Sequence, residues 1–301
     1  MNDYTYKPTA KSYFSGMGGM DLGLSYAGID VRQSLEIDNA ACITLTRNFS
    51  HRILKVDICN QTVLDQERTD ISVFTYPCTK YSTIADIHGT RTGDELFLHA
   101  LRHLALEQPE AYVVENVPGM RKFPVVMEAM SQLPDYYITV FCPINSLTWL
   151  PQVRKRLIII GTKRRFHITP PDGHSRVKLS DLIEGDPRYT IPKYLVKRLN
   201  GGYRDRPIIV DPKDPDAVAP TCVSHYAKDL STRLIKDDAS PIGVRPFTPR
   251  EYARLQGFPD SFILPDSREA YKQIGNAVSV PVGEWTGNQL MKYFNKGGTN
   301  D

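Results

Sequence analysis

The sequence predicts an α/β protein in which a Rossmann-like, mostly parallel sheet carries helices on both faces and a small, loop-rich domain is attached. Three observations support this. Strand-like and helix-like segments alternate over residues 1–163, a glycine-rich turn follows the first strand, and the regular pattern stops near residue 163. Alternating strands and helices are typical of βαβ units, which build a parallel sheet.

The expected elements follow one another at short intervals. Apolar runs predict strands at 11–14, 31–36, 71–74, 111–115, 137–141 and 157–161. Helical periodicity predicts helices at 23–27, 39–48, 96–107, 248–256 and 276–293. Prolines and glycines recur without a sustained period between residues 163 and 245, as expected of a small domain built from loops. We therefore assign 1–163 plus 246–301 to the larger domain and 164–245 to the smaller one.

Composition narrows the class of protein. The chain has 301 residues, no run long enough to span a membrane and no signal-peptide pattern, so we expect a cytoplasmic protein, or a nuclear one if the source has a nucleus. Its five cysteines form no Cys-x-x-Cys pair, which favours free thiols over disulfides or a zinc site. Residues 151–250 hold 20 lysines and arginines against 11 acidic residues, although the whole chain carries only +3. Such a basic segment suits contact with phosphates, and a solvated basic surface is the alternative.

A glycine turn at the first strand end indicates a cofactor site. Its residues are Phe14, Ser15, Gly16, Met17, Gly18 and Gly19. Glycines there let a ligand approach the backbone, and a plain tight turn is the alternative. Glu36 follows at the end of the second strand, where an acidic side chain binds ribose hydroxyls in nucleotide-binding folds. Asp57 lies at the next strand end, where it could bind an adenine amino group. We expect an adenosine-bearing cofactor and no metal.

Two further strand ends carry reactive side chains. Pro77 and Cys78 follow the run 71–74, which places a thiol at the edge of the sheet. Glu115 ends the apolar run 111–115, where a carboxylate is costly to bury unless it is paired or catalytic; a structural ion pair is the alternative. Arg154 and Arg156 enter the run 157–161 at alternate positions, so we expect both side chains on one face.

Taken together, these motifs resemble the cytosine-5 DNA methyltransferases of bacteria and phages. The glycine turn resembles that family's cofactor motif, Pro77-Cys78 its nucleophile and 115–117 its Glu-Asn-Val motif. The segment 152–156 resembles its Gln-x-Arg-x-Arg motif. Two later stretches, 245–259 and 271–278, complete the resemblance, which covers nearly the whole chain apart from the variable segment.

The resemblance implies a DNA (cytosine-5) methyltransferase that uses S-adenosylmethionine and releases S-adenosylhomocysteine. Cys78 would add to cytosine C6 as the nucleophile, while Glu115, Arg154 and Arg156 would complete the catalytic group. The further cofactor contacts would be Ile37, Ile58, Pro77, Asn276, Ala277 and Val278. The small domain would recognise the target sequence in double-stranded DNA with the cytosine flipped out, and the candidate DNA contacts are Thr79, Ser82, Arg164, Arg165, Arg204, Arg206 and Thr221.

The resemblance also sets expectations about partners. It implies a monomer that needs no membrane, and it makes a cognate restriction endonuclease a candidate partner. The chain departs from the family pattern after the nucleophile, where Thr79-Lys80-Tyr81 replaces the usual glutamine, and at Asp94-Glu95 and Ser279. Three other functions are alternatives: a transfer-RNA methyltransferase, whose Cys-Phe-Thr signature is not found in this sequence, a catalytically silent DNA-binding or regulatory protein, and a nicotinamide dehydrogenase, which the glycine turn alone suggests.

Overall fold

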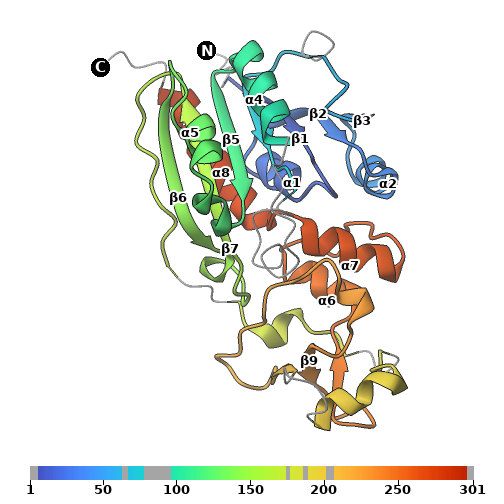
Figure 1. The fold of residues 1–301 in the computed structure, drawn as a ribbon. Helices are drawn as coiled ribbons and strands as arrows, with labels where there is room; N and C mark the ends of the chain where they lie inside the picture. The colour runs from blue at the N-terminus through green and yellow to red at the C-terminus, as the bar shows by residue number, and fades with distance from the viewer. Residues whose placement is uncertain are drawn as a thin grey trace, which may run out of the picture. The chain divides into compact units, whose positions relative to one another are not determined.

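The computed structural model describes residues 6–62, 67–77, 96–173, 177–185, 189–200 and 207–296. Cys78, Thr79, Ser82, Arg204 and Arg206 lie outside these residues. The chain forms two compact units, which are described separately (Figure 1). The large unit comprises Met1–Asn145, Lys155–Pro171 and Val280–Asp301, and the small unit comprises Ser146–Arg154 and Asp172–Ser279. Residues 246–279, which we assign to the larger domain from the sequence, group by contacts with the small unit.

The large unit is built on a seven-stranded sheet in the order β3-β2-β1-β4-β5-β7-β6. Its strands are β1 (Thr9–Tyr13), β2 (Asp30–Glu36), β3 (Arg52–Lys55), β4 (Ile71–Phe74), β5 (Ala111–Asn116), β6 (Tyr137–Asn145) and β7 (Lys155–Thr162). The first five are parallel, and β7 runs antiparallel to both β5 and β6. The predicted α/β class with a mostly parallel sheet is confirmed.

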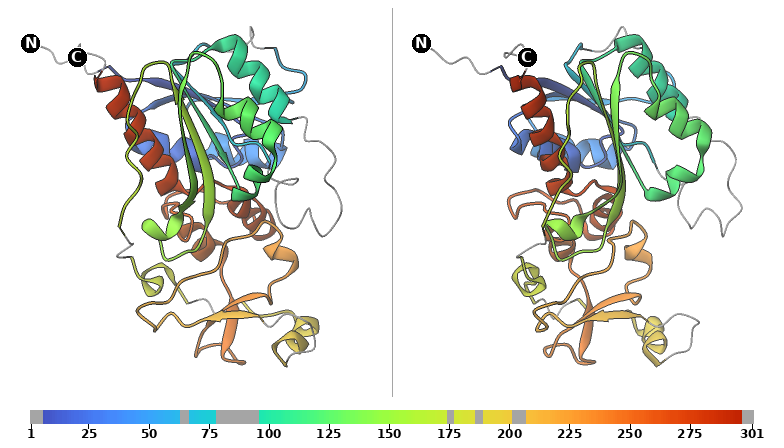
Figure 2. Two further views of the ribbon diagram at one scale, coloured as in Figure 1. Left: turned by 60° about the vertical axis from the view of Figure 1, so that its left-hand side comes forward. Right: turned by 90° about the vertical axis from the view of Figure 1, so that its left-hand side faces the viewer.

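Helices cover both faces of this sheet. They are α1 (Gly19–Tyr26), α2 (Asn39–Asn48), α4 (Leu96–Glu107), α5 (Pro124–Ser131) and α8 (Val280–Asn295). Figure 2 shows α4 and α5 on one face and α1 and α8 on the other. Glycines let α1 and α8 pack closely, because a Cβ on Gly23 would meet the Val280 carbonyl oxygen at 2.4 Å and one on Gly283 the Met20 oxygen at 3.0 Å. No described helix could cross a membrane.

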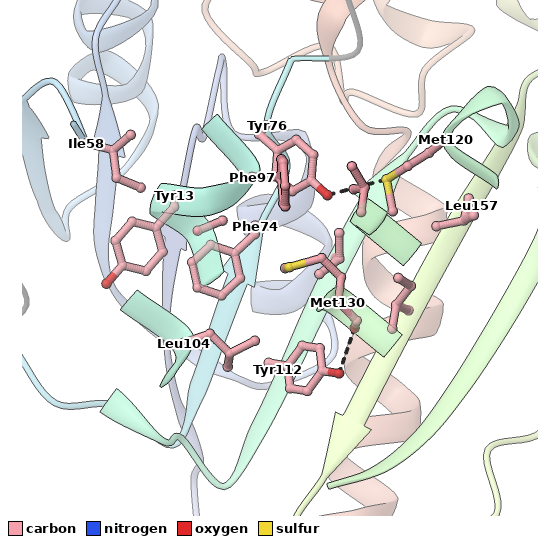
Figure 3. Packing of buried hydrophobic residues seen from close by; sticks show 14 of the residues in the cluster. Tyr13, Ile58, Phe74, Tyr76, Phe97, Leu104, Tyr112, Met120, Met130 and Leu157 are labelled. Atoms are coloured by element: carbon pink, nitrogen blue, oxygen red, sulfur yellow. Dashed lines mark hydrogen bonds between the residues drawn. The ribbon is translucent and has the colours of Figure 1, made fainter. Parts of the chain in front are cut away.

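An apolar core fills the space between the sheet and the α4–α5 layer (Figure 3). Alternate residues of the strands point into it, namely Tyr13, Phe74, Tyr112, Val114, Leu157 and Ile159. Gly161 leaves room for the Tyr112 ring, which would lie 2.0 Å from an added Cβ. Two tyrosine hydroxyl groups in this core form hydrogen bonds. The Tyr112 hydroxyl donates to the Met130 carbonyl, and the Tyr76 hydroxyl donates to the Met120 sulfur.

A buried polar cluster joins α4 to β1 and β4 beside this core. Glu107 accepts from Lys11 Nζ at 2.5 Å, from the Tyr13 hydroxyl at 2.6 Å and from Ser72 Oγ at 2.9 Å. His103 is fully buried in the same cluster, with Nδ1 at 3.3 Å from the Tyr13 hydroxyl. Burial, helped by the neighbouring Arg102 and Lys11 charges, lowers the pKa of His103 to about 4. The imidazole is therefore neutral at physiological pH.

Among its described residues, the small unit holds a three-stranded sheet and two α-helices. Its strands are β8 (Ile208–Val210), β9 (Arg233–Lys236) and β10 (Val244–Pro246), and its helices are α6 (Pro249–Arg254) and α7 (Ser267–Asn276). Short 3-10 helices occupy Ser146–Thr148, Leu179–Leu182, Lys193–Asn200 and Tyr226–Lys228 here and Pro118–Lys122 in the large unit. The helix predicted at 276–293 is present as α8, but its predicted start was wrong. The backbone is extended at Ala277, so that α7 ends at Asn276 and α8 begins at Val280.

A buried ionic network fixes the end of the small sheet to α6. Arg245 donates to both carboxylate oxygens of Glu251, at 2.8 and 2.7 Å, and to Asp237 at 2.5 Å. Both Arg245 and Glu251 are fully buried. Glu251 also closes a capping box with Thr248 at the start of α6. This network orders the segment that follows the small sheet.

Candidate active site

The glycine turn between β1 and α1 has the backbone shape that a ligand-binding turn needs. Phe14, Gly16 and Gly18 have positive φ angles of 62°, 57° and 88°. Gly18 also has no room for a side chain, because a Cβ there would lie 2.4 Å from the Phe49 ring. No side chain in the described parts of the chain caps the start of α1, so its first N–H groups face the turn as donors. A Cβ on Gly16 would meet nothing within 4 Å, so the turn is open on that side.

Glu36 at the end of β2 holds the glycine turn in place. One carboxylate oxygen accepts from the Gly16 N–H at 2.7 Å, and the other accepts from Ile37 and Asp38 at 2.9 and 2.8 Å. A carboxylate has about four lone-pair sites, so these three bonds leave one site, on the oxygen that bonds to Gly16, for a ligand hydroxyl. The structure thus brings the predicted ribose-binding residue and the predicted glycine turn together.

Asp57 forms a tight turn after β3. Its carboxylate accepts from the Cys59 N–H at 2.9 Å, and its carbonyl accepts from the Asn60 and Gln61 N–H groups. Ile58 turns inward and joins the core cluster with 6% of its surface exposed. The ends of β1, β2 and β3 are neighbours at one edge of the parallel sheet, so Asp57 lies at the same edge as the glycine turn.

The segment before the predicted nucleophile is fixed from both sides at this edge. Thr75 bonds to β1, through its N–H to the Tyr13 carbonyl at 3.2 Å and its hydroxyl to the Phe14 carbonyl at 2.9 Å. On the other side, Asn116 Nδ2 at the end of β5 donates to the Tyr76 carbonyl at 3.1 Å. Pro77 is the last described residue of this segment, and Cys78 follows it directly.

Glu115 and Arg156 form the central ion pair of the edge. Arg156 Nε lies 2.9 Å from Glu115 Oε1, and only 14% and 10% of the two side chains are exposed. Glu115 pairs with Ile158 across β5 and β7, so Arg156 is its diagonal neighbour on the same face. β4 lies beside β5 with Phe74 opposite Val114, which puts Glu115 next to the Thr75–Pro77 segment. A carboxylate, its arginine and the chain leading to a thiol thus meet at one place.

Arg154 has different partners from Arg156. Its guanidinium is buried in the small unit and donates to the carbonyls of Cys222, Gly275 and Ala277, at 3.0, 3.1 and 2.7 Å. The sequence led us to expect the two arginines on one face. Instead, Arg154 precedes β7 and organises the segment of Asn276, Ala277 and Val278, whereas Arg156 lies in the strand and pairs with Glu115.

Comparison with known proteins agrees with this geometry. The family model described as C-5 cytosine-specific DNA methylase matches residues 9–200 and 222–292. The chain belongs to this family. It is 31% identical to the Type II methyltransferase M.NlaX of Neisseria lactamica over 89% of this chain and 91% of that one. It is 29% identical to M.Bsp6I of a Bacillus strain, over 90% and 94% of the two chains.

A solved structure confirms the fold of this methylase. The methyltransferase EhMeth of Entamoeba histolytica superposes with a TM-score of 0.77 and covers 98% of this chain and 100% of its own. At 18% identity, this likeness shows a shared Rossmann-like fold and nothing finer. The chain is therefore an enzyme of the DNA cytosine-5 methyltransferase family, as the motifs imply.

Two candidate DNA contacts of the methylase lie at the opposite edge of the large sheet. Arg164 and Arg165 follow the end of β7, which is the edge where β5 begins. β5 spans about 20 Å, so these arginines are far from Glu115. Arg164 pairs with Glu110 at 3.2 Å and stacks on Tyr293, and Arg165 lies over the Tyr137 ring. Their contact with DNA stays a prediction that this position does not favour.

Thr221, the last candidate DNA contact, is half-buried in the small unit, and its hydroxyl donates to the Val153 carbonyl at 2.6 Å. Sequence reasoning missed two positioning residues of the methylase. Asn116 holds the Tyr76 carbonyl, and Gln152, fully buried, bonds to the Cys222 N–H and the Leu255 carbonyl. Asn116 and Gln152 both lie inside motifs named in the sequence analysis. Their position in these motifs, next to Glu115 and Arg154, is the signal from which a positioning role could have been predicted.

Proposed function

We propose that this methylase transfers the methyl group of S-adenosylmethionine to C5 of a cytosine that is flipped out of double-stranded DNA at a specific sequence. The Glu115–Arg156 ion pair beside the Thr75–Pro77 segment is the observation that carries the proposal. This ion pair supplies a carboxylate for the cytosine ring, next to the segment that leads directly to Cys78. A base inside a duplex cannot reach such a site, which is why flipping is part of the proposal.

Cys78 would act as the nucleophile. Its thiolate adds to C6 of cytosine, and the electron pair of the C5–C6 double bond then makes C5 nucleophilic. Glu115 would hydrogen-bond the N3 and N4 edge of the base and stabilise the ring as the thiolate adds. Arg156 would hold the Glu115 carboxylate in position, and Arg154 would act by ordering residues 275–277. Loss of the C5 proton restores the double bond and releases the Cys78 thiolate.

S-adenosylmethionine would supply the methyl group as a sulfonium whose carbon–sulfur bond breaks when the C5–methyl bond forms. The residues fit an adenosine-bearing ligand: the uncapped start of α1 offers N–H donors, and Glu36 and Asp57 offer carboxylate acceptors at neighbouring strand ends. We propose that these hold the amino-acid part, the ribose and the adenine, together with Ile37, Ile58 and Pro77. Asn276, Ala277 and Val278 are proposed as further cofactor residues.

The proposed nucleic-acid partner is double-stranded DNA, read by the small unit. Thr79, Ser82, Arg204, Arg206 and Thr221 are the proposed contacts. The relatives are named Type II methyltransferases, so we propose a cognate restriction endonuclease as a partner in the cell, and a monomer as the active species. The proposed domain boundaries remain 1–163 plus 246–301 and 164–245.

The test is bisulfite sequencing of DNA from a host that expresses the chain, with Cys78→Ser as the matched variant. We expect 5-methylcytosine at one sequence context with the unaltered chain and none with Cys78→Ser. DNA that carries 5-fluorocytosine in that context should trap a covalent adduct at Cys78, because the fluorine cannot leave as a proton does. Methylation by Cys78→Ser at the normal rate, or methylation of transfer RNA in place of duplex DNA, would refute the proposal.

A further inference from the structure

We propose that Arg102 on α4 is a positioning residue for adenine recognition, which acts by holding the turn that carries Asp57. This inference rests on the proposed role of Asp57 in binding the adenine amino group. It concerns a residue outside the glycine turn and the catalytic group, on a helix that covers the α4–α5 face of the sheet.

The contacts of Arg102 converge on the backbone of the turn. A single guanidinium nitrogen, Nη2, donates to the Ile58 carbonyl at 2.8 Å and to the Gln61 carbonyl at 2.7 Å. The N–H groups of Cys59, Asn60 and Gln61 bond to Asp57, and the two carbonyls that Arg102 binds belong to the same turn. Arg102 thus stabilises the turn through bonds from α4, while Asp57 stabilises it through bonds to other residues of the turn.

The guanidinium is well placed to fix the turn because its own position is restrained. It lies on the central turns of α4, next to the fully buried His103, whose Nε2 is 3.3 Å from Nη2. His103 is locked in turn by the Tyr13 hydroxyl and the cluster around Glu107. Hydrogen bonds from a charged donor to carbonyls are stronger than those between neutral groups. The turn is therefore tied to α4 and, through it, to β1.

The carboxylate orientation of Asp57 depends on this restraint. Its Oδ1 is committed to the Cys59 N–H, which leaves Oδ2, 3.5 Å from Asn60 Nδ2, as the acceptor for a ligand amino group. If the carbonyls of Ile58 and Gln61 lost their shared donor, the turn could open and the direction of Oδ2 would no longer be fixed. Within the described parts of the chain, Arg102 bonds neither to the glycine turn nor to Glu36, so the structure around these two should not change.

The test uses two ligands that differ at the adenine amino group. S-adenosylhomocysteine carries it, and S-inosylhomocysteine has a carbonyl oxygen in its place. We expect the unaltered chain to prefer the adenosine ligand by about tenfold or more in calorimetric titration, the effect of one hydrogen bond to a charged acceptor. Arg102→Met should bind the adenosine ligand about tenfold more weakly and the inosine ligand with unchanged affinity, so that the preference disappears.

Two further variants keep the inference testable. Arg102→Lys retains a cation that can donate to both carbonyls and should restore most of the preference. If Arg102→Met does not fold, Arg102→Gln, which is neutral and shorter, takes its place and should show the same loss of preference. Arg47→Met removes an exposed arginine of α2 and should leave both affinities unchanged. Hydrogen exchange at residues 57–62 should speed up in Arg102→Met and not in Arg47→Met.

The outcomes separate the inference from the proposed function. An equal loss of affinity for both ligands, or no loss, in Arg102→Met would overturn the role of Arg102 while leaving the role of Asp57 intact. A lack of preference in the unaltered chain would instead refute Asp57 as the adenine-binding residue, and the inference with it. Failure to bind either ligand would refute the cofactor itself.

Discussion

Replacing Gly18 by alanine tests whether the glycine turn is shaped by sterics as well as by its backbone angles. Gly18 has φ of 88°, a region that costs an L-residue about 1–2 kcal/mol. An alanine Cβ would also lie 2.4 Å from Phe49 Cε2 and 2.9 Å from Leu45 Cδ2, and overpacking of this kind costs about 1–3 kcal/mol. We therefore expect the free energy of unfolding to fall by about 2–5 kcal/mol.

Two other variants separate the backbone part of this cost from the steric part. Gly173→Ala has a similar φ of 90° and nothing within 4 Å of the added Cβ, so it should show the backbone part alone, about 1–2 kcal/mol. Adding Phe49→Leu to Gly18→Ala removes most of the clash and should recover the steric part. Urea unfolding of the four proteins measures these differences.

The same substitution should weaken cofactor binding. Because Gly18 sets the direction of the uncapped N–H groups of α1, a shifted turn should lower the affinity for S-adenosylhomocysteine by about tenfold or more in calorimetric titration. If Gly18→Ala and Gly173→Ala lost equal stability, the steric argument would be wrong. If Gly18→Ala bound the ligand as tightly as the unaltered chain, the turn would not be the cofactor site.

Three further predictions concern other parts of the molecule. Glu115→Gln should slow methyl transfer by about 10²–10⁴-fold with the affinity for S-adenosylhomocysteine unchanged, whereas Glu110→Gln at the opposite edge should not slow it. Single-turnover rates measure both variants, and equal losses of rate would contradict the assignment of Glu115 as a catalytic residue. The low pKa of His103 means that the folded state binds fewer protons than the unfolded state between pH 4 and 6.5, so acid lowers the free energy of unfolding. The contribution of His103 to that free energy is complete above pH 6.5, and about 2–3 kcal/mol of it is lost by pH 4.5. His103→Asn should flatten the fall in urea stability between pH 7 and 4.5, and an unchanged slope would exclude His103 as its cause. Arg245→Met leaves buried Glu251 unpaired and should cost about 3–5 kcal/mol, against less than about 1 kcal/mol for Lys213→Met in an exposed pair; hydrogen exchange in β9 and β10 measures both, and equal effects would refute the argument.

Several elements could be predicted from the sequence because local physics defines them. The helices 39–48 and 96–107 have the predicted bounds, since both follow clear periodicity and the first begins at an aspartate cap. The helix predicted at 276–293 was wrong at its start, because α7 and α8 are divided by three residues without any helix-breaking glycine or proline at the break itself. There, the carbonyls of Gly275 and Ala277 bond to Arg154, and that contact is remote in sequence.

The sequence by itself determined the family, the parallel sheet and the strand ends that carry the candidate site. These follow from short motifs and from the rule that parallel strands bring their carboxyl ends to one edge. Only the tertiary structure decided which groups meet there. Arg154 and Arg156 are two residues apart, yet one binds carbonyls of the small unit and the other binds Glu115. Arg164 pairs with Glu110 at the far edge, and Arg102 reaches the Asp57 turn from a helix more than forty residues away. The spacing of residues along a chain determines on which face of a strand or helix a side chain lies. Its partner on a neighbouring element depends on register and packing.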